Sequence, residues 1–134
     1  MNRILWICNI MLPAIGRELN MPYSNREGWL TGIYERICRE KKRNGNGMGI
    51  ELGICFPMDE GTEEAMGRQE KQREFRLRES GVFCYGFREN LAMPERYDAG
   101  LEERLKEILE DFKPDMVHIF GTEFPHTLAM VRAF

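Results

Sequence analysis

The sequence lacks several of the patterns that most directly reveal a protein's function. It contains neither the G-x-G-x-x-G fingerprint nor a P-loop, which argues against NAD and ATP as cofactors. None of its four cysteines belongs to a CxxC pair, so their spacing does not indicate zinc or thioredoxin chemistry. With 19 basic and 22 acidic residues, the net charge of −3 lacks the positive excess typical of nucleic-acid binding.

Long hydrophobic runs are also missing, and none is long enough to span a bilayer. Arg3 and the apolar stretch 4–15 have the outline of a signal peptide. However, Asn9 and Pro13 interrupt the stretch, and no small-residue cleavage site follows. We therefore expect a cytoplasmic protein whose cysteines are mostly buried, reduced thiols.

Four compact apolar runs are typical of strands that are buried on both faces of a parallel sheet. They cover residues 3–9, 50–56, 82–87 and 115–120. Apolar residues at three- and four-residue steps predict amphipathic helices over 28–43 and 98–112, the second with Asp98 as its N-cap. Pro125 suits the first turn of a further helix that extends to Phe134.

The connecting segments are less informative. Residues 10–27 lack strong periodicity and are interpreted as a long loop that is mobile without ligand. Residues 58–79 are charged and have no clean apolar stripe, so either a surface helix near 63–73 or a mobile loop fits them. Residues 74–78 alternate apolar and charged side chains, which predicts a short outer strand paired with 82–87.

The alternation of strands and helices predicts one α/β domain over 1–134, a Rossmann-like three-layer sandwich. With the four apolar runs numbered along the chain, we expect a parallel sheet of order 3-2-1-4. In such a sheet, ligands bind outside the carboxyl ends of the strands, where the strand order reverses. The loop after strand 1 and the turn after strand 4 should therefore face each other across a ligand site.

The loop after strand 1 ends in Glu27, Gly28 and Trp29 at the start of a helix. Backbone N–H groups and the helix dipole favour an anion there. Gly28 has no Cβ and would let a phosphate or a sugar approach the backbone closely. The alternative is that Gly28 only relieves crowding between the loop and the helix.

The segment that begins at His118 carries the second group of candidates. His118, Glu123 and His126 are candidate catalytic residues, because a histidine or a carboxylate can transfer a proton near neutral pH. Gly121 and Thr122 are candidate substrate-binding residues, together with the three at the first loop. The alternatives are a core position for His118 and helix capping for the others. We expect no metal site, because strand and helix geometry would separate the possible ligands.

These two segments carry a family resemblance. RILWICN, the following loop into GWLTG, and PDMVHIFGTEFPHTLAM resemble the corresponding parts of family 4 type glycosyltransferases. The resemblance implies the N-terminal, acceptor-side domain of a GT-B fold, in an enzyme that transfers a sugar from a nucleotide-sugar donor to an acceptor. It also implies retention at the anomeric carbon and no metal cofactor. Gly28 matches the second glycine of the family loop, whose backbone lies near the donor phosphates, and His118 matches the first His of an H-x-H pattern.

The chain departs from the family pattern at two positions. Glu27 stands where the first glycine often lies, and Phe120 stands where the active-site His often lies. No counterpart of the donor-binding C-terminal domain is present. We therefore expect a truncated half of a GT-B enzyme, inactive alone, with peripheral membrane contact in the full enzyme. The alternatives are a non-catalytic nucleotide- or sugar-binding α/β module and a flavodoxin-like signalling domain.

A truncated sheet should expose an edge. In GT-B domains further strands pair beyond the fourth, so strand 115–120 would be left with unpaired backbone groups and apolar side chains. Met116, Val117, Ile119 and Phe120 would contribute those side chains. We therefore expect a homodimer joined at or near this edge and the helix 124–134, as a consequence of the truncation.

Overall fold

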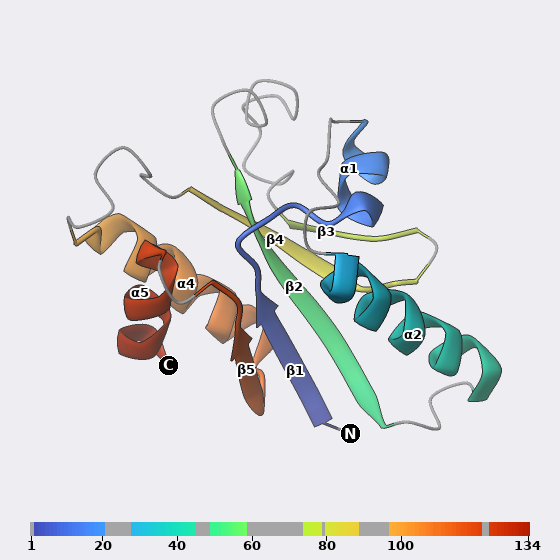
Figure 1. Cartoon of the computed structure of the whole chain (residues 1–134). Coiled ribbons are helices and arrows are strands. Elements are labelled where there is room, and N and C mark those ends of the chain that lie inside the picture. The colour runs from blue at the N-terminus through green and yellow to red at the C-terminus, as the bar shows by residue number, and fades with distance from the viewer. Residues whose placement is uncertain are drawn as a thin grey trace.

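The computed structural model describes residues 2–20, 28–44, 49–58, 74–78, 80–88, 97–121 and 124–134. Within these residues the chain is an α/β fold in which helices cover a five-stranded mixed sheet, which is compatible with a Rossmann-like architecture (Figure 1). The elements in chain order are β1 (Asn2–Ile7), α1 (Pro13–Leu19), α2 (Gly28–Asn44), β2 (Ile50–Met58), β3 (Glu74–Arg76), β4 (Phe83–Arg88), α4 (Ala99–Phe112), β5 (Met116–Ile119) and α5 (Pro125–Ala133).

The strand order is β3-β4-β2-β1-β5. It differs from the expected four-strand order 3-2-1-4 because the sheet has a fifth strand, β3, at its outer edge. β3 pairs antiparallel with β4, whereas the pairs β4–β2, β2–β1 and β1–β5 are parallel. The short outer strand predicted within 74–78 is therefore present, while residues 59–73 lie outside the described part of the chain.

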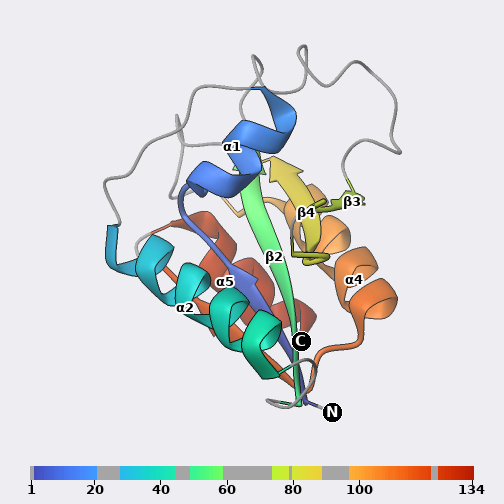
Figure 2. The same ribbon diagram turned by 90° about the vertical axis from the view of Figure 1, so that its right-hand side faces the viewer.

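The sheet separates two apolar layers, and Figure 2 shows α2 and α4 on its opposite sides. On one face, α1 and α2 pack against side chains that alternate along the strands, such as Trp6, Ile54 and Cys84. On the other face, α4 and α5 cover the intervening side chains, such as Leu5 and Tyr85. This alternation is the period of two expected for a strand buried on both faces.

The predicted helices 28–43 and 98–112 are confirmed as α2 and α4. Asp98 is the N-cap of α4, and its Oδ1 accepts a hydrogen bond from the Leu101 N–H at 3.1 Å. At the other end of α4, Lys113 adopts the left-handed conformation, and its N–H donates to the Leu109 carbonyl. The local signals of cap and apolar stripe were sufficient to predict this helix.

The interpretation of residues 10–27 as one loop was wrong, because α1 occupies Pro13–Leu19. Pro13 begins the helix, and Asn20 ends it in the left-handed conformation. Leu12 and Ile15 are buried against the sheet, three residues apart. This short apolar spacing was the missed signal: tertiary burial stabilises a helix that is too short to form alone. Residues 21–27, to which the predicted mobility also applied, lie outside the described residues.

The cysteines are free thiols, as expected from their positions in apolar runs. Cys8, Cys55 and Cys84 are buried, whereas Cys38 on α2 is partly exposed. Burial raises the pKa of each of the three buried thiols far above its ordinary value. These groups are therefore neutral packing residues and not reactive thiolates.

Candidate functional site

The candidate site lies at the carboxyl end of β1, where the strand order reverses. β1 pairs with β2 on one side and with β5 on the other. The chain therefore leaves both β1 and β5 at the same edge of the sheet, because the two strands are parallel. The Trp29 ring, at the start of α2, lies 5.6 Å from the Phe120 ring, just beyond β5. This contact places the start of α2 and the turn after β5 on one rim, as the sequence predicted.

Gly121 lies where the loop after β1 approaches the end of β5. Its φ is +80°, a conformation that favours glycine. A Cβ at this position would lie 2.7 Å from Cβ of Asn9 and 2.7 Å from a ring carbon of Phe124. The missing side chain therefore allows the loop after β1 to contact the turn after β5. Asn9, which the sequence analysis treated only as an interruption of an apolar run, is a main constituent of this contact.

Backbone and side-chain hydrogen bonds hold the turn from β5 into α5. The Gly121 carbonyl accepts from the Phe124 N–H at 3.2 Å and from the Thr127 hydroxyl at 3.1 Å. Pro125 occupies the first turn of α5, where its lack of an N–H costs nothing. Phe124 is the N-cap of α5 and Thr127 lies inside it, so Gly121 is fastened to a rigid element.

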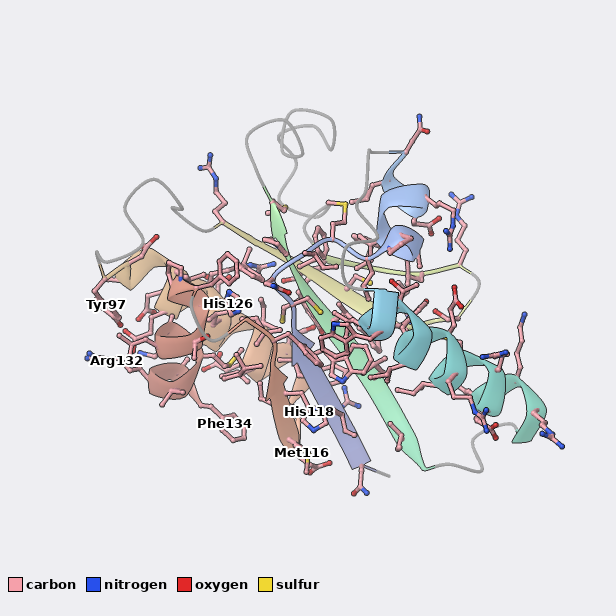
Figure 3. All side chains as sticks on the ribbon, viewed as in Figure 1. Tyr97, Met116, His118, His126, Arg132 and Phe134 are labelled. Carbon is pink, nitrogen blue, oxygen red and sulfur yellow. The ribbon has the colours of Figure 1, made fainter. Side chains whose placement is uncertain are left out.

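His126 is a buried residue at the start of α5, and its solvent-exposed fraction is 0% (Figure 3). Its Nε2 lies 2.8 Å from the Phe120 carbonyl oxygen, and because that oxygen can only accept, Nε2 carries the proton. The imidazole stacks on the Phe124 ring and meets the Phe87 ring edge-on. This environment supports a positioning role for His126, because a fully buried imidazole is not exposed to a ligand at the surface.

His118 lies on β5, opposite Trp6 in the register of the two parallel strands. Its side chain is exposed, and Nε2 contacts the Met116 sulfur at 3.0 Å on the same strand (Figure 3). The alternative of a core histidine is therefore wrong. His118 precedes the end of the strand, and the described structure does not bring it together with His126.

Phe120 contacts two tryptophans at the rim. Its ring packs edge-on against Trp6 at 5.4 Å and is tilted against Trp29 at 5.6 Å. Phe120 is therefore part of an apolar aromatic cluster. The sequence places Trp6, Trp29 and Phe120 near strand ends or a helix start, which could have suggested an aromatic cluster. Only the fold shows that the three rings meet.

Gly28 and Trp29, at the start of α2, are exposed among the described residues. A Cβ added to Gly28 would meet none of the described atoms within 4 Å. The alternative that Gly28 relieves crowding with the preceding loop depends on residues 21–27, which lie outside the described part of the chain. The neighbouring Trp29 side chain is 56% exposed. The first turn of α2 therefore combines free backbone approach with an exposed aromatic surface, a combination suited to a sugar or a nucleotide.

Three candidate residues, Glu27, Thr122 and Glu123, lie outside the described residues. In the parts of the chain that are described, no group of three or more His, Cys, Asp or Glu side chains is arranged to hold a metal ion. The described helices include none with the length and apolarity that crossing a membrane demands. No family model, curated protein or solved structure matches the chain.

Proposed function

We propose that this domain is the acceptor-side half of a GT-B glycosyltransferase that uses a nucleotide-sugar donor. The observation that carries the proposal is the rim at the end of β1. The open first turn of α2 faces the turn after β5 across the Trp29–Phe120 contact. The resemblance of both segments to family 4 type glycosyltransferases supports it, as does a three-layer α/β fold in which ligands bind at such a rim.

The roles of the rim residues follow from their chemistry. The first N–H groups of α2 would receive the donor phosphates, and the glycine at position 28 would allow them to approach the backbone. Trp29 and Phe120 offer apolar ring surfaces for a sugar or a base. A second domain, facing this rim, would hold the rest of the donor.

The two histidines differ in their access to the rim. His126 is buried against the Phe120 carbonyl, and His118 is exposed on the strand before the rim. We therefore assign His126 to positioning the turn and leave Glu123 and His118 as the candidates for acid–base work. The same observation favours the second candidate function, a nucleotide- or sugar-binding α/β module without catalysis.

The test is a titration of the isotope-labelled chain with nucleoside diphosphates and nucleotide sugars, followed by amide NMR. A ligand at the rim should shift the amides of residues 28–32 and 120–127, with a dissociation constant on the order of 1 mM. Gly28→Val should abolish these shifts by filling the approach to the helix. Gly32→Val is the matched control, because a Cβ at Gly32 also meets nothing within 4 Å and lies one turn farther along the same helix.

The outcomes separate the hypotheses. Shifts that are absent at roughly 10 mM of every probe, or that survive Gly28→Val, would refute ligand binding at this rim. If binding is found, an assay for sugar transfer with the complete gene product decides between the two functions. Transfer supports the glycosyltransferase, whereas binding without turnover supports the module.

A further inference from the structure

Five of the seven large hydrophobic side chains that are exposed in the described chain lie near one edge of the sheet. The large hydrophobic residues that are exposed are Trp29, Ile33, Tyr97, Met116, Leu128, Val131 and Phe134. Four of them belong to β5, α5 and the residue after α5, and Trp29 contacts Phe120 from the other face. Such a concentration beside one edge is unusual for a surface that faces only water.

The edge strand at this place has few of the features that discourage pairing with another chain. β5 is the last of the described strands and pairs with β1 along one side only. The strand contains no lysine and no proline; Pro114 and the charged Asp115 come before its first residue. Its short length is the one protective feature present.

α5 presents an uncharged apolar stripe beside this edge. Leu128, Val131 and Phe134 follow one another at three-residue steps and are exposed by 54%, 64% and 66%. The one formal charge between Pro125 and Ala133 is Arg132, and it is engaged elsewhere. Its guanidinium lies over the Tyr97 ring at 4.8 Å, and its Nε is 3.5 Å from a carboxylate oxygen of Glu102 (Figure 3).

We propose that a second copy of this chain covers the edge, in a two-fold symmetric dimer. β5 of each copy would pair antiparallel with β5 of the other, and the two α5 stripes would pack together on one face. An uncharged stripe is complementary to itself, because a two-fold axis brings the same residues face to face without opposing like charges. A charged partner would find no countercharge there.

The exposed apolar surface is adequate for a stable dimer. Met116 is 51% exposed, and with the α5 stripe and Trp29 it belongs to a set of five side chains near the edge. If each has a full surface of about 200 Å², their exposed fractions correspond to roughly 600 Å² per copy. Standard interfaces bury about 800 Å² per partner, so backbone pairing along β5 would need to add about 200 Å².

Sedimentation velocity of the full chain is the first test. At about 100 μM, moderately tight dimers are populated. The mass obtained from sedimentation should then be twice the chain mass of 15.8 kDa. The double variant Leu128→Lys, Val131→Lys should sediment as a monomer with an unchanged circular dichroism spectrum, because both side chains are exposed. Glu110→Lys on α4 is the matched control: it changes the net charge by the same two units at an exposed position and should remain dimeric.

Cross-linking locates the interface even if the double variant misfolds. In a Cys38→Ser background, Val131→Cys should form an intermolecular disulfide under mild oxidation, since position 131 lies near the two-fold axis. Lys42→Cys, at an exposed position near the end of α2, should not. A monomer at all concentrations, a dimer that persists in the double lysine variant, or equal cross-linking at both positions would overturn the proposal.

Discussion

Gly121 provides the sharpest test of how the candidate site is built. A methyl group at this position meets two obstacles in the structure. The backbone has φ of +80°, a conformation that costs a residue with a Cβ roughly 1–2 kcal/mol. The new Cβ would also lie 2.7 Å from Cβ of Asn9 and 2.7 Å from the Phe124 ring.

The second cost is the larger one. Cβ of Asn9 is attached directly to the backbone of the loop after β1, so it can move only if that loop moves. Overpacking of this kind costs about 1–3 kcal/mol. Gly121→Ala should therefore lower the free energy of unfolding by roughly 2–5 kcal/mol, and for a chain of this length each kcal/mol lowers Tm by roughly 3–5 °C.

The assay is urea unfolding followed by circular dichroism, with Gly28→Ala as the matched control. A Cβ at Gly28 would meet none of the described atoms within 4 Å, and its φ is not in the left-handed region. Its replacement by Ala should leave stability unchanged or raise it by up to about 1 kcal/mol. If Gly121→Ala is as stable as the wild-type chain to within about 0.5 kcal/mol, the loops after β1 and β5 do not meet as described.

Three further predictions concern the packing that supports the site. Burial raises the pKa of all three buried thiols, so only the unfolded chain releases their protons above about pH 8.5. The free energy of unfolding should therefore be at its full value below that pH. It should fall as the pH rises, by about 1.4 kcal/mol per pH unit for each thiol. Urea midpoints that stay constant from pH 7 to pH 10 would contradict this linkage. Asp98→Ala should cost about 1 kcal/mol by removing the cap bond to the Leu101 N–H, whereas Asp98→Asn should retain most of that stability, as urea unfolding can show. His126→Phe keeps a ring of similar size but leaves the buried side of the Phe120 carbonyl without its donor, for a loss of about 1–3 kcal/mol; an unchanged midpoint would argue that the bond contributes little.

Much of the fold could be predicted from the sequence, because its signals are local. The stripes of α2 and α4, the Asp98 cap and Pro125 at the start of α5 depend on residues within a few positions of each other. The apolar runs that became β1, β2, β4 and β5 depend equally on local composition. The same reasoning missed α1, because seven residues give too little periodicity unless the buried positions are known.

The tertiary structure decided which candidate residues are accessible. The sequence alone does not distinguish the environments of His118 and His126. In the structure His118 is exposed on an edge strand, whereas His126 packs against two aromatic rings. Phe120 lies between two tryptophans that are distant in the chain. By itself, the sequence determined where most of the strands and helices form, since that depends on near neighbours. Burial, access and the open edge at β5 depend on which distant segments pack together, and only the folded chain sets those distances.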